Sequence, residues 1–174
     1  IKIWDPLMSK FNSQAVLQKI TARFSDSISL PTQPYGLLTF ETGKENISEV
    51  LQFLKEDKEL QFIYLTDITG IHYPEEELPI GVIYHLHSLV NNVRVRIKVF
   101  LEGEKPVIPT ATNLWEGANW MERETYDFFG IVFEGHPNLV RILNVDEMTV
   151  FPMRREYPLE DPNRVDKKDY FFGR

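Results

Sequence analysis

Two runs of alternating apolar and polar residues, GVIYHLHSLV and VRVRIKVFL, flank Asn91 and Asn92 near the middle of the chain. Such alternation predicts two paired strands with one buried face, and the two asparagines suit the positive φ angles of a two-residue hairpin loop. We predict a register in which Val90 faces Val93. The same register pairs Ser88 with Val95, Leu86 with Ile97, Tyr84 with Val99, Leu89 with Arg94, His87 with Arg96, and His85 with Lys98. Because a one-residue slip would mix the two faces, this hairpin commits the chain to a sheet with one apolar side.

Apolar spacing before the hairpin predicts two amphipathic helices and three further strands. Residues 12–24 form the first helix, capped by Asn12 or Ser13, and residues 46–57 form the second, where Asn46 and Glu49 resemble a capping box. The strands are expected at residues 27–30, 37–42 and 61–73, with a possible bulge at Gly70. The order α-β-β-α-β-β-β describes a two-layer α+β domain with helices on one side of a mixed sheet.

The chain changes character after the hairpin. Residues 102–115 contain two prolines and read as an irregular linker, and residues 116–129 read as a third helix that Gly130 ends. Beyond Gly130 the periodic pattern fades, yet aromatic residues persist in a polar stretch interrupted by prolines, which suggests anchors that dock on a partner. We therefore expect a two-layer domain at 1–114, a signature helix with a return segment packed on it at 115–143, and an extended docking tail at 144–174.

Composition excludes several classes of function. The chain has no cysteine, which rules out disulfides, Cys-ligated zinc and cysteine-held iron–sulfur clusters within it. Its net charge of −7 argues against nucleic acid as a partner, because binding phosphates needs a basic face. No apolar run approaches the roughly 20 residues that span a bilayer.

Carboxylates gather on the third helix. Glu122, Glu124 and Asp127, with His136 further on, could form a metal or acid–base site. The alternative is that these charges anchor a neighbouring segment or subunit, and Arg123 and Asp127, four residues apart, could also pair locally. We favour anchoring, because di-metal carboxylate sites use Glu-x-x-His pairs on several helices and this chain has a single carboxylate-rich helix.

Two other motifs have an ordinary structural reading beside a functional one. His85 and His87 share one strand face at a spacing that can bind metal, but their expected cross-strand partners are cationic, which favours a solvated face. Residues 153–156, MRRE, could bind an anion, although the adjacent carboxylates favour an ion-pair network. The chain has neither a phosphate-binding glycine loop nor a hydrolase motif. The residues alone thus indicate an interaction domain with a docking tail.

The stretch ERETYDFFGIVFEGHPNLVRIL, residues 122–143, closely resembles the signature of the thirty-kilodalton subunit family of respiratory complex I, the proton-pumping NADH:quinone oxidoreductase. The matching positions are Glu122, Arg123, Glu124, Tyr126, Asp127, Gly130, Ile131, Phe133, His136, Pro137, Arg141, Ile142 and Leu143. The chain departs from the family further on. A Trp and a Gly that commonly precede Pro-Leu-Arg-Lys-Asp are absent, Met153 replaces the Leu, and Arg155 with Glu156 replace Lys-Asp.

The resemblance implies a subunit of an oxidoreductase that has no active site, cofactor or metal of its own, with FMN, iron–sulfur clusters and quinone held by partner subunits. It implies a peripheral position on the cytoplasmic side of the bacterial inner membrane, packed against the quinone-site and cluster-bearing subunits of the peripheral arm. An equivalent subunit of a membrane-bound hydrogenase-type complex is the alternative, and a free-standing metalloenzyme is a third hypothesis.

The resemblance also names the residues that we expect to organise the structure and its interfaces. Glu122, Arg123, Glu124 and Asp127 are expected to position the third helix against a returning segment around His136, Arg141 and the Arg154–Arg155 pair. The full set is Glu122, Arg123, Glu124, Tyr126, Asp127, Gly130, His136, Pro137, Arg141, Arg154, Arg155, Tyr157, Phe171 and Phe172.

Overall fold

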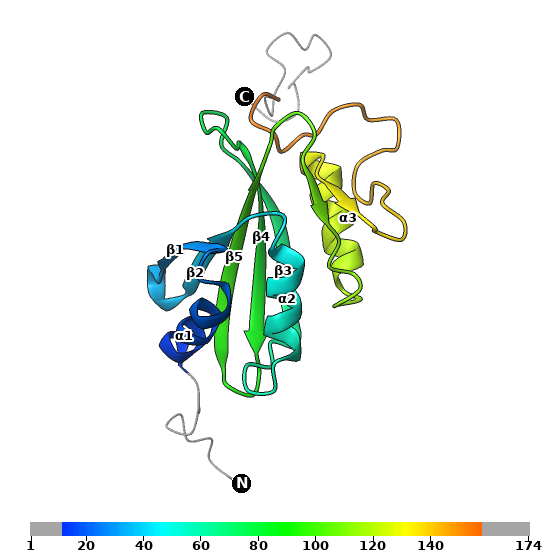
Figure 1. Cartoon of the computed structure of the whole chain (residues 1–174). Helices are drawn as coiled ribbons and strands as arrows, with labels where there is room; N and C mark the ends of the chain where they lie inside the picture. The colour runs from blue at the N-terminus through cyan, green and yellow to red at the C-terminus, as the bar shows by residue number, and fades with distance from the viewer. Residues whose placement is uncertain (1–11, 158–174) are drawn as a thin grey trace, which may run out of the picture.

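A five-stranded mixed sheet forms the centre of the molecule in the computed structural model, which describes residues 12–157 (Figure 1). The strands lie in the order β1-β2-β5-β4-β3, and β2 and β5 are parallel while the other neighbours are antiparallel. The elements up to the end of the sheet are α1 (Ser13–Phe24), β1 (Ile28–Thr32), a 3-10 turn (Pro34–Gly36), β2 (Leu38–Thr42), α2 (Ile47–Glu56), β3 (Tyr64–His72), β4 (Ile80–Ser88) and β5 (Val93–Leu101). The predicted fold class and the order α-β-β-α-β-β-β are confirmed.

Both early helices pack on the apolar face of the sheet, in front of it in Figure 1. α1 buries Val16, Ile20 and Phe24, and α2 buries four aliphatic residues of its own. The predicted cap of α1 is present, since the Ala15 amide donates to the Asn12 side chain at 2.9 Å. The capping box predicted for α2 is wrong, because Asn46 has helical backbone angles and its side chain accepts no capping hydrogen bond.

The predicted faces of the hairpin are right and its register is wrong by two residues. Ser88 faces Val93, so the loop has four residues instead of two. The reason is Asn91, a buried side chain whose amide donates to the carbonyls of Glu59 and Leu60 at 2.7 and 3.2 Å. A shift of two residues leaves every side chain on its own face, so alternation alone could not distinguish the two registers.

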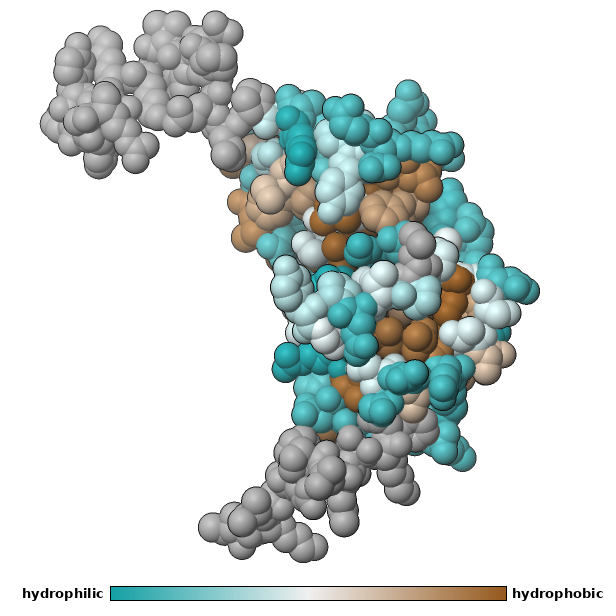
Figure 2. Space-filling view, turned by 90° about the vertical axis from the view of Figure 1, so that its left-hand side faces the viewer, coloured by the Kyte–Doolittle hydropathy of each residue, from teal (hydrophilic) through white to brown (hydrophobic). Residues whose placement is uncertain are grey.

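The free edge at β1 is protected by its sequence. Pro31 removes a backbone donor there, and the pairing with β2 shifts between Ser29 and Thr32. Both features discourage another strand from adding to this edge. Figure 2 views the molecule from this side and shows hydrophobic areas broken up by hydrophilic ones.

The opposite edge, β3, is covered by α3 (Ala118–Phe129), which lies alongside it in Figure 1. The Thr125 hydroxyl lies 3.3 Å from the Ile68 carbonyl and 2.8 Å from the Met121 carbonyl, so this side chain brings the helix backbone and the edge strand together. Gly70 does not form the predicted bulge. The irregularity in the pairing of β3 with β4 lies between Leu65 and Asp67. Instead, Gly70 lets the Phe129 ring approach, since a Cβ there would lie 2.4 Å from that ring.

Two short strands that the sequence did not predict flank α3. β6 (Val107–Pro109) lies in the expected linker and pairs in parallel with β7 (Val132–Glu134). A strand of three residues is too short to show alternation in the sequence. β6 is defined only by its pairing with β7, which lies about 25 residues later in the chain. Within residues 12–157, no helix is long and apolar enough to cross a membrane.

Candidate functional site at the end of helix α3

Helix α3 ends at Gly130, which adopts the left-handed conformation with φ of 73°, as predicted. The last four carbonyls of a helix lack partners inside it, and all four have partners here. Tyr126 O accepts from Gly130 N at 2.8 Å, Asp127 O from Arg141 Nη1 at 2.9 Å, Phe128 O from Met153 N at 3.1 Å, and Phe129 O from Arg154 Nε at 2.7 Å. Three of the four partners belong to residues 138–157, which contain no helix or strand and which we call the anchored segment.

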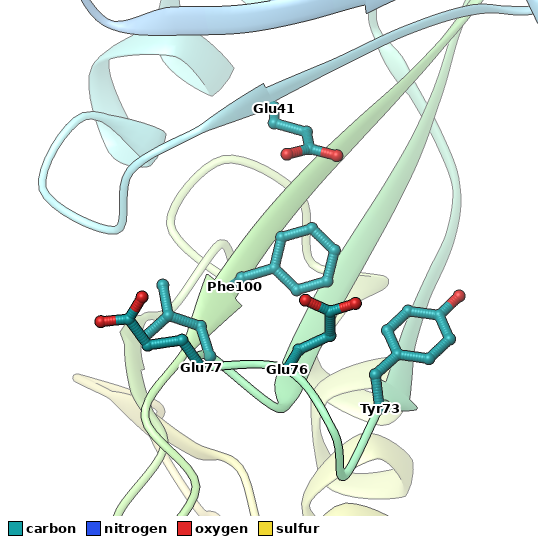
Figure 3. Close-up of a pocket in the computed structure, with 6 residues that line it drawn as sticks. Glu41, Tyr73, Glu76, Glu77 and Phe100 are labelled. Carbon is teal, nitrogen blue, oxygen red and sulfur yellow. The ribbon is translucent and has the colours of Figure 1, made fainter.

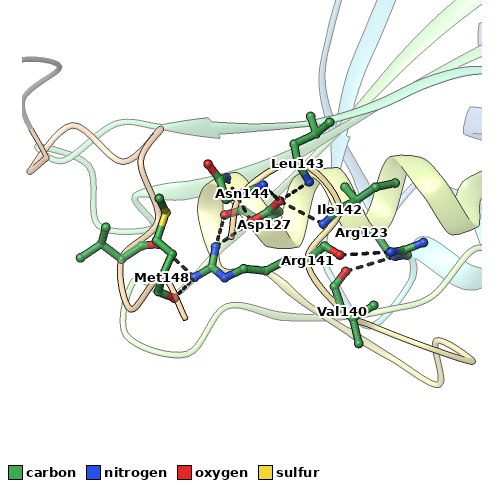
Figure 4. A network of polar contacts seen from close by, with 9 residues as sticks. Arg123, Asp127, Val140, Arg141, Ile142, Leu143, Asn144 and Met148 are labelled. Carbon is green, nitrogen blue, oxygen red and sulfur yellow. Dashed lines mark hydrogen bonds and ion pairs between the residues drawn. The ribbon is translucent and has the colours of Figure 1, made fainter. Parts of the chain in front are cut away.

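Asp127 is the centre of this arrangement (Figure 4). It is fully buried, and its Oδ1 lies 2.7 Å from the Arg141 guanidinium. Its Oδ2 accepts the backbone amides of residues 142–144 at 2.8 to 3.1 Å, and the Asn144 side chain donates to Oδ1 at 3.0 Å. Burial by itself raises the pKa of Asp127, but these donors and Arg141 together hold that pKa well below its usual range. Asp127 is therefore ionised, and both of its oxygens accept hydrogen bonds from the anchored segment.

Two arginines donate further hydrogen bonds to the anchored segment. Arg141 also donates to the carbonyls of Met148 and Val150 at 2.7 and 3.0 Å. Arg123 donates to the carbonyls of Val140 and Arg141, both at 3.1 Å. The local pair between Arg123 and Asp127 that the sequence allowed does not form, because each side chain instead holds the anchored segment (Figure 4).

Phe151 closes the site and was not predicted. The guanidinium groups of Arg141 and Arg154 each lie 5.2 Å from the centre of its ring, which meets the Tyr126 ring edge-on at 6.0 Å. It rests on Gly130, where a Cβ would lie 2.5 Å from the ring. The only sequence signal for Phe151 was an aromatic residue beside a proline in a polar stretch.

Gly130→Ala should destabilise this site by about 2–4 kcal/mol, because alanine resists the left-handed conformation and its methyl group collides with Phe151. Urea unfolding of the full chain measures the effect, and faster tryptic cleavage after Arg154 would show that the segment has loosened. Gly117→Ala is the matched control, since Gly117 has a φ of −60° and nothing near its added Cβ. Equal stability of the two variants would contradict the role given to Gly130.

Glu122 does not face the anchored segment, which corrects the prediction for it. Its carboxylate accepts from the Thr110 hydroxyl and the Ala111 amide, both at 2.6 Å, and so holds the chain after β6. It is fully buried. Burial raises its pKa from 4.5 to about 7, a rise that the hydrogen bonds from Thr110 and Ala111 partly oppose. The nearby Tyr84 hydroxyl is buried and has no hydrogen-bond partner in the described part of the chain.

His136 and Glu124 also depart from the expected constellation. His136 Nδ1 accepts from the Asn138 amide at 3.0 Å, so its Nε2 donates to the Asn119 carbonyl at 3.1 Å. Both ring nitrogens thus stabilise the turn at Pro137, which is itself exposed. Glu124 is exposed and forms no hydrogen bond or ion pair with any other residue of 12–157. Across that range, no group of three or more His, Asp or Glu side chains could hold a metal ion.

The last predicted residues lie at the end of the described chain. Arg155 uses its backbone amide, which donates to His72 Nδ1 at 3.0 Å, and its side chain is exposed. Arg154 Nη1 lies 3.9 Å from Glu156 Oε1, and this pair is the part of the expected MRRE ion-pair network that residues 12–157 contain. Tyr157 is 37% exposed, and its predicted interface role stays a prediction. Phe171 and Phe172 lie outside the described residues.

The fold and the site together define a class of protein: an α+β domain that holds an irregular segment rigidly on its third helix. A family model described as "Respiratory-chain NADH dehydrogenase, 30 Kd subunit" matches residues 40–163. An NADH-quinone oxidoreductase subunit of Citrifermentans bemidjiense is 43% identical over 153 residues, which cover 88% of this chain and 93% of that protein. The chain belongs to the family of the 30-kDa subunit of respiratory-chain NADH dehydrogenase, as the resemblance of residues 122–143 implied.

Two solved structures share the fold. The trypsin-resistant fragment (1–134) of Nqo5 is 33% identical with a TM-score of 0.63, over 72% of this chain and 98% of the fragment. A chain of the archaeal membrane-bound sulfane sulfur reductase has a TM-score of 0.71 over 84% of this chain and 85% of its own. At 23% identity, the second likeness shows the fold alone.

Proposed function

We propose that this chain is a peripheral-arm subunit of a proton-translocating NADH:quinone oxidoreductase that holds no cofactor and catalyses no step itself. In this role it organises the cluster-bearing and quinone-site subunits, which carry electrons from NADH to quinone and hold the FMN and iron–sulfur clusters. Family membership supports the assignment to this complex. The same proposal puts the chain on the cytoplasmic side of the bacterial inner membrane as a peripheral component.

The observation that carries the organising role is the contrast within the anchored segment. Its backbone is held by buried charges, whereas Val140, Leu143, Val145 and Met153 present exposed side chains. Leu143 and Val145 are each more than 60% exposed although they flank Asn144, which is bound to Asp127. An irregular segment that is already ordered loses little conformational entropy when a partner covers its apolar side chains.

Leu143→Asp with Val145→Asp should leave the fold of the chain intact and lower its recovery in the assembled complex more than about tenfold, because a partner surface would then have to bury two carboxylates. Affinity purification of the tagged chain from its own membranes measures recovery, with NADH:quinone activity assayed in the same sample. Leu89→Asp in the hairpin turn is the control, since Leu89 is 55% exposed. A variant that assembled fully but lost turnover would contradict the organising role.

The same purification distinguishes the alternative, an equivalent subunit of a hydrogenase-type membrane complex. Copurified flavin with NADH:quinone activity supports the first proposal, and copurified nickel would support the second. The sulfane sulfur reductase shares only the fold with this chain, so it favours neither. The division into units at 1–114, 115–143 and 144–174 stays a prediction.

A further inference from the structure

A groove of about 390 Å³ opens where the loop between β3 and β4 meets β2 and β5 (Figure 3). It is lined by Glu41, Tyr73, Glu76, Glu77, Leu78 and Phe100. Figure 3 shows the Phe100 ring between the carboxylates of Glu41 and Glu76, with the Tyr73 ring beside them. The two rings are 6.4 Å apart. The groove therefore combines an aromatic floor with carboxylates on its rim.

Backbone hydrogen bonds fix the loop that forms one wall of this groove. The Tyr73 amide donates to the Pro79 carbonyl at 2.7 Å, and the Glu76 amide donates to the Tyr73 carbonyl at 3.1 Å, so the loop is closed on itself. A Cβ at Gly81 would lie 2.7 Å from the Ile71 side chain and 3.1 Å from the Phe100 ring, so the glycine lets both pack closely there. Because the loop is already ordered, its side chains lose less conformational entropy when a ligand binds, which favours binding.

The charges around the groove are only partly balanced. Glu41 lies 3.8 Å from Lys98, while Glu76 and Glu77 form no ion pair with any residue of the described range. In residues 12–157, no group of three or more His, Asp or Glu side chains could hold a metal ion, and the groove is no exception. A cation over an aromatic face with carboxylates at its edge is the arrangement that a planar guanidinium fits.

Two other aromatic sites of the chain pair a ring with an arginine in this way. Arg23 lies over Phe53 at 4.8 Å and Phe24 at 5.5 Å. That hollow is also lined by Glu49, Glu56 and Asp57. The Phe151 ring likewise contacts two arginines. Over Phe100 and Tyr73, in contrast, no arginine or lysine of residues 12–157 is placed.

We propose that this groove is a second docking site, which binds an arginine side chain carried by a neighbouring polypeptide chain. The guanidinium stacks on Phe100 and donates hydrogen bonds to Glu76 and Glu41. Charge complementarity selects this occupant, because the groove carries unpaired negative charge and an aromatic face. The site shares no residue with the anchored segment, so it goes beyond the organising role proposed above.

Photo-cross-linking in the assembled complex tests this proposal. Leu78 on the groove rim is replaced by p-benzoylphenylalanine, and the same replacement of Leu89 in the hairpin turn is the control. We expect a cross-link from position 78 to another chain, within about two residues of an arginine. Phe100→Leu, and separately Glu76→Gln with Glu77→Gln, should each lower its yield about fivefold. Glu116→Gln, an exposed carboxylate elsewhere, should not.

Several results would overturn the proposal. A cross-link from position 78 to a second copy of this chain, or to residues beyond 157 of the same chain, would do so. A cross-link to a partner segment without arginine, or no cross-link in an intact complex, would do so as well. Each of them leaves the organising role standing, because that role is measured by recovery of the complex.

A second measurement needs no complex. Titrating the labelled full chain with N-acetylarginine amide should shift the amide signals of Tyr73, Glu76 and Phe100 saturably, and N-acetylnorleucine amide should not. Equal shifts with both probes would also refute the proposal.

Discussion

Asp127→Asn should detach the anchored segment from α3 and lower the amount of assembled complex. Asparagine keeps the shape of the side chain but replaces one acceptor oxygen with an NH₂ group that faces other donors. It also leaves the guanidinium of Arg141, which is only 9% exposed, without a counter-charge. Removing one partner of a buried ion pair costs about 3–5 kcal/mol. Amide hydrogen exchange of residues 142–144 should therefore accelerate by about two to three orders of magnitude.

Asp146→Asn is the matched control for this experiment. Asp146 lies in the same segment, is exposed, and forms no hydrogen bond with other residues of the described range. It should leave both exchange and assembly unchanged within about 0.5 kcal/mol. Wild-type protection in the Asp127 variant would show that the segment is held by packing on Phe151 rather than by charge.

The depressed pKa of Asp127 also sets the pH range over which the anchor operates. A carboxyl group whose pKa is lower in the folded state stabilises the fold above its unfolded pKa of 3.8. That stabilisation is lost only as the pH falls through the lower, folded value. The anchor should thus persist throughout the neutral and mildly acidic range.

Glu122→Gln should make the chain more stable at pH 8 and leave its stability at pH 4 nearly unchanged. The pKa of Glu122 is raised from 4.5 to about 7, so the folded state favours the protonated carboxyl. This group therefore contributes its full stability below pH 4.5, and that contribution is lost as the pH rises through 7. The pKa rise corresponds to about 3 kcal/mol. Urea unfolding of the full chain at several pH values measures it.

Glutamine suits this position because it resembles the protonated acid. Its carbonyl can accept from the Ala111 amide and its NH₂ group can donate to the Thr110 hydroxyl. Glu124→Gln on the same helix is the control, since Glu124 is exposed, and it should keep the wild-type pH dependence. If the Glu122 variant lost stability at pH 8, the ionised carboxylate would be the form that the fold requires.

The sequence predicted the parts of the fold that depend on local pattern. Alternation separated the two faces of β4 and β5, three- and four-residue spacing identified the helices, and Gly130 marked the end of α3. It could not predict the register of the hairpin, because the buried amide of Asn91 bonds to carbonyls about 30 residues earlier. It missed β6 for the same reason, since that strand is defined only by pairing with β7.

The candidate site divides in the same way. The signature stretch was enough to identify the family and to name Asp127, Arg123 and Arg141 as organisers. Sequence spacing could not show that Glu122, on the same helix, holds the chain after β6 instead of the anchored segment.

The sequence by itself determined which faces of the early helices and of the hairpin are apolar, where those elements form and to which family the chain belongs, because these follow from the order and type of residues. The tertiary structure alone decided which donors surround each carboxylate, because donors from distant segments meet a side chain only after the chain has packed. The pKa values of Asp127 and Glu122 consequently move in opposite directions from similar starting points.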